Sequence, residues 1–139
     1  MASGLGGASA GAAGALVDFA GLWGAEIGWG ELGSIASSLG SDVPFFLSGG
    51  TALVRGRGEE VVPLPDVQPM WLVLLVPPHQ LAAKTAEMYR HLTPADWSSG
   101  DRTEAMARAI SKAGLLRQAL AGNAFERQAD VSFPSLAGQ

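Results

Sequence analysis

The sequence predicts an α+β fold in which helices pack on a mixed or antiparallel sheet. Three observations support this class. Apolar residues recur at helical spacing near the N-terminus and again in the second half of the chain. Two short β-rich runs flank a glycine-containing turn in the middle, which is typical of a hairpin. The resulting order of helices, then strands, then helices fits a layered α+β arrangement.

The first two predicted helices lie before residue 41. Composition alone would make residues 1–14 a flexible leader. However, the next apolar residues are spaced three and four apart, so the glycines come directly before a helix or run into its first turn. A second helix is predicted over residues 31–39, with Gly40 as its C-terminal stop. The spacing of the first helix rests on Ala15, Leu16, Phe19, Ala20 and Trp23.

Strands are predicted over residues 51–55 and 60–64, joined by a turn at residues 56–58. Residues 70–76 form the best predicted strand, because they are continuous and apolar. Such a run indicates a strand that is buried on both faces. The two prolines at 77–78 end it.

The second half is predicted to be mainly helical. Helices are expected over residues 81–92 and 102–113, with a loop over 93–101 between them. Residues 115–131 are predicted to be helical, with an interruption near residues 122–123.

Composition excludes several function classes. The chain has 139 residues, about one ordinary domain, and is 47% hydrophobic with a net charge of -4. That charge argues against nucleic acid as a partner. The absence of cysteine excludes disulfides, zinc–thiolate sites and a cysteine nucleophile. The longest strongly apolar run is too short to cross a membrane, and the start lacks the basic residues of a signal peptide, so a cytoplasmic location is expected.

The glycine-rich segment at the N-terminus is the first candidate site. Glycines before a helix let backbone approach a phosphate, and the helix start offers free N–H groups. The segment lacks the Gly-Lys-Ser/Thr ending of a P-loop, so a structural Gly/Ala leader remains the alternative to anion binding. The candidate residues are Ser3, Gly4, Leu5, Gly6, Gly7, Ala8 and Ser9.

Asp42 is the second candidate. Next to a proline, an aspartate is often a turn or cap residue, and the functional alternative is a general base beside a phosphate site. His79 and His91 are too far apart for a helical metal pair, so surface positions and no metal site are predicted. Tyr89 lies one helical turn beyond Thr85 and is either half-buried or stacked on a planar ligand. The four tryptophans are expected in the core or at its rim.

Taken together, these segments resemble the GHMP kinase superfamily, and within it the kinases that act on 4-diphosphocytidyl-2-C-methyl-D-erythritol in the non-mevalonate isoprenoid pathway. The family's loop MAAGLGGGSSDAA is matched by MASGLGGASAGAA at the start of the chain. Its segment GADVPFFL-GGTA--GRGE---PLP is matched by residues 40–65. The Thr-Ala-x-x-Tyr pattern is matched by Thr85, Ala86 and Tyr89, and Asn-Asp-Leu-Glu more weakly by residues 123–126.

The resemblance implies ATP-dependent phosphorylation of the 2-hydroxyl of that small-molecule substrate. It places Asp42 at the catalytic base, residues 3–9 around the ATP phosphates with Mg²⁺ bridging them, and Thr85 and Tyr89 at the substrate, with the ring of Tyr89 against the cytosine. It also divides the chain into the end of an N-terminal ATP-binding domain, residues 1–65, and the start of a C-terminal domain, residues 66–139.

The sequence departs from the family pattern, which implies a partial GHMP fold that is truncated at both ends and whose kinase activity is impaired. The family's Pro-Ala-Lys-Asn lysine and its C-terminal Gly-Ser/Thr-Gly segment have no match, and Lys84 is the first lysine. In the loop, Ala8, Ala10 and Gly11 replace a glycine, a serine and an acid or amide. The alternative is therefore a non-catalytic remnant that binds a nucleotide or a partner. A homoserine or mevalonate kinase is disfavoured by DVPFFL and GRGE. Self-association is expected through exposed sheet edges.

Overall fold

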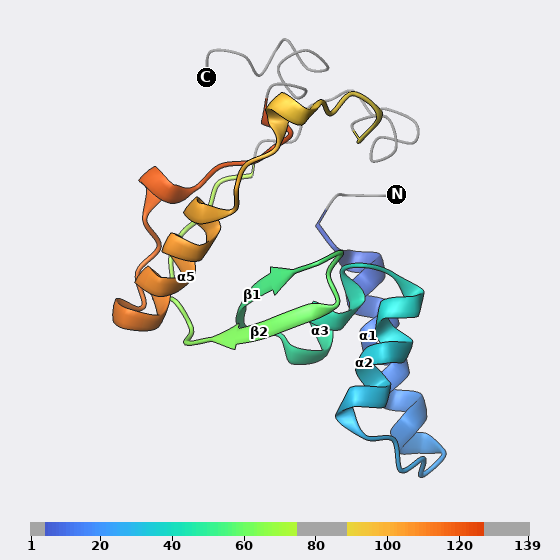
Figure 1. Ribbon diagram of the computed structural model, residues 1–139. Coiled ribbons are helices and arrows are strands. Elements are labelled where there is room, and N and C mark those ends of the chain that lie inside the picture. Colours follow the sequence, from blue (N-terminus) through green and yellow to red (C-terminus); the bar gives the residue numbers. More distant parts are fainter. Residues whose placement is uncertain (1–4, 75–88, 127–139) are drawn as a thin grey trace. The chain divides into compact units, whose positions relative to one another are not determined.

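The structure, a computed structural model, describes residues 5–74 and 89–126 (Figure 1). These residues belong to two compact units. The first contains the described residues up to Val67 together with Ile110–Gly114, and the second contains the others. Helices and an antiparallel sheet both occur, so the predicted α+β class is confirmed. The assignment of two kinase domains divided after residue 65 stays a prediction.

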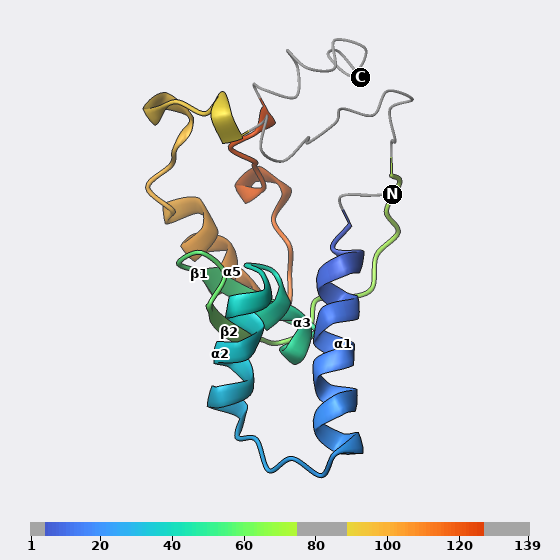
Figure 2. The same cartoon turned by 90° about the vertical axis from the view of Figure 1, so that its right-hand side faces the viewer.

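Three helices dominate the first unit: α1 (Gly7–Leu22), α2 (Trp29–Leu39) and α3 (Val43–Ser48). Helices α1 and α2 run side by side, and α3 contacts both of them as well as strand β2 (Figures 1 and 2). The two longer helices confirm the predictions from periodicity. Helix α2 ends at Gly40 as expected and begins two residues earlier than predicted. Helix α3 was not predicted, because six residues are too few to show a helical period.

Small side chains form the centre of this unit. Ala13 of α1, Ala36 of α2 and Val43 of α3 are each no more than 2% exposed and pack as one cluster. Alanines at a helix contact let the two backbones approach closely, so the glycine- and alanine-rich sequence of α1 packs as a helix rather than trailing as a leader. The partly buried residues around the cluster are Ala12, Leu16, Phe46 and Leu47.

The predicted hairpin is confirmed to the residue. Strand β1 (Thr51–Arg55) pairs antiparallel with β2 (Glu60–Leu64). At the turn end, Arg55 Nη1 donates to Glu60 Oε1 at 3.2 Å across the strands. Pro63 is tolerated within β2 because a strand in a two-stranded sheet has an unpaired edge.

The turn of the hairpin holds a carboxylate with a lowered pKa. The backbone N–H groups of Glu59 and Arg57 bond to the Glu59 carboxylate and lower its pKa below the ordinary 4.5, with a smaller contribution from the Arg57 cation. The Arg57 N–H lies 2.6 Å from Glu59 Oε2. A lowered folded-state pKa adds stability that is complete above the unfolded-state value and is lost as the pH falls through the folded-state value.

We therefore expect the turn to loosen in acid. Followed by NMR from pH 7 to pH 2, the Arg57 amide resonance should titrate with a midpoint below 4.5. In Glu59→Gln that transition should disappear, whereas Glu31→Gln, which changes an exposed carboxylate on α2, should leave it unchanged. A midpoint at or above 4.5 would contradict the lowered pKa of Glu59.

The predicted strand over residues 70–76 is wrong for its described part. Residues 70–74 have no strand structure, and Trp71 is fully exposed. A strand needs a neighbouring backbone to pair with, and one buried on both faces also needs a layer on each side. Within the described residues only β1 and β2 are strands, and they pair with each other. Residues 75–78 lie outside the described part.

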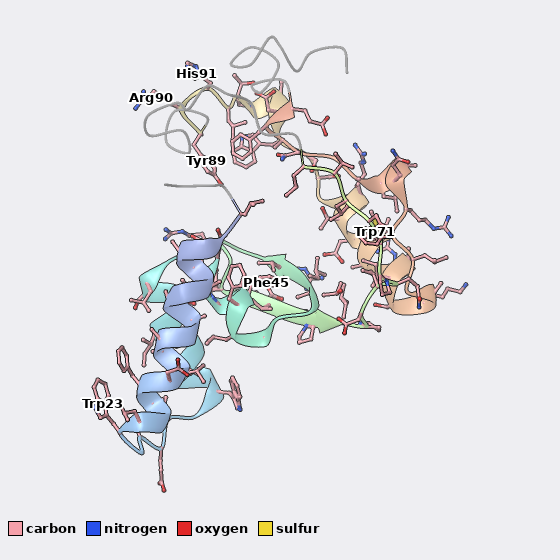
Figure 3. All side chains as sticks on the ribbon, turned by 180° about the vertical axis from the view of Figure 1, so that it is seen from behind. Trp23, Phe45, Trp71, Tyr89, Arg90 and His91 are labelled. Atoms are coloured by element: carbon pink, nitrogen blue, oxygen red, sulfur yellow. The ribbon has the colours of Figure 1, made fainter. Side chains whose placement is uncertain are left out.

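The tryptophans are not in the core, which corrects that expectation. Trp23 is exposed and stacks on Phe19, with ring centroids 5.1 Å apart. Figure 3 shows it at the end of α1 far from Phe45. Trp29, Trp71 and Trp97 are exposed as well. The cluster where α1, α2 and α3 meet is built on two alanines and one valine, and none of the four tryptophans packs against it.

The second half of the chain contains helix α5 (Asp101–Ala113), which confirms the helix predicted there. Before it, the predicted loop contains a short 3₁₀ turn, η1 (Pro94–Asp96), capped by Thr93. The Asp96 carboxylate accepts from the Thr93 N–H at 2.8 Å and from its hydroxyl at 2.7 Å. Of the predicted helix over residues 81–92, residues 81–88 lie outside the described part, and Tyr89 and Arg90 are helical.

The helix predicted over residues 115–131 is wrong for residues 115–125. They contain only a short 3₁₀ turn, η2 (Gln118–Leu120). The Arg102 guanidinium on α5 donates to the carbonyls of Ala119 and Ala121. These hydrogen bonds hold the segment as a loop against α5. The spacing of apolar residues along the chain does not reveal such an interaction between distant residues. Residues 127–131 lie outside the described part.

Removing that guanidinium should release the loop. In Arg102→Ala, we expect amide exchange at Leu120 and Ala121 to become roughly fivefold faster, the equivalent of about 1 kcal/mol of local stability. Hydrogen exchange followed by NMR measures this. Arg108→Ala, an exposed arginine on the same helix, is the matched control. Equal exchange rates in the two variants would contradict the role of the Arg102 hydrogen bonds in holding the loop.

Candidate active site

The first part of the site is the turn that leads into α1. Gly6 has φ +71°, a left-handed conformation that favours glycine. The helical bonding of α1 starts with the Ala10 N–H donating to the Gly6 carbonyl at 2.9 Å. The amides of Gly7, Ala8 and Ser9 therefore have no acceptor within the helix. An exposed helix start of this kind carries partial positive charge and can bind an anion.

The second part is the turn that leads into α3. The Val43 N–H donates to the Gly40 carbonyl at 3.2 Å, which closes a β-turn around Ser41 and Asp42. Asp42 has φ −91° and ψ −12°, the values of the third residue of a type I turn. Its side chain is exposed and makes no capping hydrogen bond to α3. The carboxylate at the start of α3 thus remains available to a ligand.

These two turns line one cavity of about 310 Å³. Among the described residues that line it, Asp42 is the only one with an ionisable side chain. The rest of the lining is mainly apolar, and Phe45 and Phe46 meet edge to face with ring centroids 5.2 Å apart. Figure 3 shows Phe45 beside the hairpin of the first unit. The lining residues are Leu5, Gly6, Ser41, Asp42, Phe45, Phe46 and Val54.

The structure brings together some of the predicted site residues. Leu5, Gly6 and Asp42 share the cavity, and residues 7–9 form the first turn of α1 immediately after it. Ser3, Gly4 and Thr85 lie outside the described residues. Tyr89 belongs to the second unit, where it is 57% exposed and meets Phe125 edge to face at 5.0 Å. Their roles stay predictions.

Four cavity-lining residues, Ser41, Phe45, Phe46 and Val54, are not among the predicted site residues. A signal for two of them exists in the sequence. Phe45 and Phe46 follow Asp42 by three and four positions, which on a helix places them on the same side as Asp42. That signal could be used only if the segment was known to be helical. Val54 lies on β1, and no local pattern connects it to the site.

Comparison with known proteins gives relatives over almost the whole chain. A 4-diphosphocytidyl-2-C-methyl-D-erythritol kinase of Dehalococcoides mccartyi (strain CBDB1) is 46% identical over 137 residues, which are 98% of this chain and 48% of the relative. The kinase of the same name from Pelotomaculum thermopropionicum is 43% identical over 138 residues, 99% of this chain and 47% of the relative. That of Geobacillus kaustophilus is 39% identical over 140 residues, with 99% and 47% covered.

The chain belongs to this kinase family. It spans about half the length of the curated relatives it matches. No protein-family model matches the sequence, and no solved structure matches the chain. The aligned region includes both turns, because the matches cover 98% or more of the chain.

The groups at the cavity fit the nucleotide and metal that such a kinase requires. The free amides of the first turn of α1 are donors of the kind that hold phosphate oxygens. Mg²⁺ is usually held by one or two carboxylates together with substrate phosphates and water. Asp42 offers one carboxylate, and within residues 5–74 and 89–126 no group of three His, Asp or Glu side chains could hold an ion alone. Mg²⁺ would therefore take most of its ligands from the nucleotide phosphates and from water.

No helix in the described residues of this kinase-family chain has the length and apolar character needed to span a membrane.

Proposed function

We propose that the protein phosphorylates the 2-hydroxyl of 4-diphosphocytidyl-2-C-methyl-D-erythritol with ATP, and that this chain carries its phosphate-binding turn and its general base. The main support is that Gly6 and Asp42 line the same cavity although they are far apart in the sequence. The names of the relatives supply the reaction and its acceptor. Both substrates are charged, water-soluble phosphates, so we place the reaction in the cytoplasm.

In the proposed reaction, the Asp42 carboxylate takes the proton of the substrate hydroxyl while the hydroxyl oxygen bonds to the terminal phosphorus of ATP. The bond from that phosphorus to the bridging oxygen breaks, and ADP leaves. The amides of residues 7–9 hold phosphate oxygens, and bound Mg²⁺ would neutralise their charge. Positioning and electrostatic stabilisation provide most of the catalysis in such a transfer, so few reactive side chains are needed.

Two other residues complete the proposal. Tyr89 is exposed, and its ring is oriented by Phe125, so one of its surfaces is available to stack on the cytosine ring. Thr85, four positions earlier in the sequence, would add a polar contact to the same substrate. We also propose that the division near residue 65 separates an ATP-binding domain from a second domain. A first compact unit that extends to Val67 supports this division.

A phosphoryl-acceptor competition tests the proposed function. ADP release by the protein is measured with the diphosphocytidyl substrate, with homoserine and with mevalonate, each in the presence of ATP and Mg²⁺. We expect turnover with the first acceptor only, and the other two should not compete. Turnover with homoserine or mevalonate, but not with the diphosphocytidyl substrate, would contradict the proposed acceptor.

The second candidate function is a remnant that binds a nucleotide or a partner without turnover. One observation favours it: Ala10 lies in the first turn of α1, where the family has a serine whose hydroxyl could serve phosphate or Mg²⁺. Calorimetric titration with ATP separates the two functions. Nucleotide binding without ADP release would support the remnant, and acceptor-dependent ADP release would support the kinase.

A further inference from the structure

The hairpin turn makes a backbone-to-backbone contact with the segment that carries Asp42. Gly58 is buried and has φ +123°, which favours glycine. A Cβ placed on Gly58 would collide with the carbonyl oxygen of Ser41 and would lie 2.7 Å from its carbonyl carbon and 3.2 Å from its Cα. Since the colliding atoms are main chain, they cannot rotate away as the end of a side chain can. The turn and Ser41 therefore fit together only when residue 58 has no side chain.

This contact lies one residue before the carboxylate of the site. Asp42 makes no capping hydrogen bond through its side chain, and the carboxylate is exposed. Its direction therefore depends on the backbone of the β-turn that Ser41 and Asp42 occupy. Whatever fixes the Ser41 carbonyl also fixes the point from which the Asp42 side chain extends.

The hairpin turn is itself held in one shape. The Gly58 N–H donates to the Arg55 carbonyl at 3.1 Å, and the Glu59 carboxylate accepts the Arg57 N–H at 2.6 Å. These two hydrogen bonds restrict the conformation of the turn, so the turn can fix the position of the Ser41 main chain that contacts it. Within α3, the Phe46 ring packs against Gly6 at the cavity. The segment that lines the site is thus contacted both at Ser41 and at Phe46.

The geometry points to Gly58 as a positioning residue for Asp42, which makes the hairpin a support for the general base. This inference rests on the proposed function for its catalytic meaning. Gly58 contributes no group to the reaction. It permits the close approach that sets the Ser41–Asp42 turn, and a side chain at position 58 would displace the carboxylate from the attacking hydroxyl. Displacement by a fraction of an ångström is enough to slow a transfer that depends on alignment.

Gly56 provides a matched control in the same turn. It also has a positive φ, +67°, and the three atoms nearest to a Cβ there all belong to the Glu59 side chain, with Cδ at 2.7 Å. That exposed side chain can move aside by giving up its hydrogen bond to the Arg57 N–H. Gly56→Ala and Gly58→Ala introduce the same methyl group at a residue of positive φ, and Gly58, at +123°, lies further from the left-handed region that other residues tolerate. Only Gly58→Ala places the methyl group against the main chain of Ser41.

Two measurements test the inference. In the kinase assay, we expect Gly58→Ala to lower kcat at least tenfold with KM for ATP changed less than threefold, while Gly56→Ala keeps kcat within threefold. Equal losses in both variants, an unchanged kcat in Gly58→Ala, or a Gly58→Ala protein that no longer folds would each overturn the positioning role.

The second measurement does not depend on turnover and so separates failure of this inference from failure of the proposed function. In the unsubstituted chain, we expect nuclear Overhauser effects between the Gly58 α-protons and the Ser41 α-proton. The amide resonances of residues 41–43 should shift in Gly58→Ala and stay in place in Gly56→Ala. Absence of the Overhauser effects would overturn the contact, whatever the kinase assay gives.

Discussion

Asp42→Asn is expected to lower kcat by about 10²- to 10⁴-fold, the usual contribution of a general base. The amide has nearly the shape of the carboxylate but cannot accept the hydroxyl proton at neutral pH. The fold should not change, because the Asp42 side chain is exposed and makes no capping hydrogen bond to α3. ADP release measured with saturating ATP and acceptor reports the loss, and circular dichroism reports the fold.

Asp18→Asn is the control for this substitution. Asp18 is an exposed aspartate on α1, so its replacement changes the net charge by the same amount and leaves the cavity unchanged. We expect kcat to stay within twofold. An Asp42→Asn protein that retains more than a tenth of the kcat, or an Asp18→Asn protein that loses as much as Asp42→Asn, would contradict the role of Asp42 as the base.

Gly6→Ala is expected to destabilise the protein by about 1–2 kcal/mol, because a non-glycine residue in the left-handed region is strained. The new Cβ would also lie 2.6 Å from Phe46 Cζ. The Phe46 ring must then swing away within the cavity that it lines. We expect weaker ATP binding in consequence. Urea denaturation and calorimetric titration with ATP measure the two effects.

Gly14→Ala should have the opposite effect on stability. Gly14 lies inside α1, it is exposed, and a Cβ there would meet nothing within 4 Å. Alanine is more favourable than glycine within a helix by about 0.5–1 kcal/mol, so the urea midpoint should rise and ATP affinity should stay the same. A higher urea midpoint in Gly6→Ala would contradict the left-handed conformation assigned to Gly6 before α1.

Elements with local signals were predictable from the sequence. The hairpin was predicted to the residue because its turn glycines and its cross-strand pattern lie within a single short segment. Helix α2 and its end at Gly40 were predicted for the same reason. The resemblance also drew attention to the glycine loop and to Asp42, which the cavity brings together.

Elements that depend on neighbours were not predictable. The run over residues 70–74 has the composition of a buried strand, but composition does not supply the adjacent strand that pairing needs. The segment over residues 115–125 has helical spacing, but Arg102 holds its carbonyls in a loop. The exposed position of Trp23, outside the cluster of Ala13, Ala36 and Val43, depends on how three helices pack together.

By itself, the sequence determined the hairpin, helices α1, α2 and α5 and the kinase family, since these depend on residues that are close together or on motifs retained in order. The tertiary structure alone decided that Gly6, Asp42 and the two phenylalanines of α3 line one cavity. It also decided that Gly58 contacts Ser41. Both results depend on how α3 packs against α1 and β2, and no pattern along the chain encodes a distance between segments that are far apart in it.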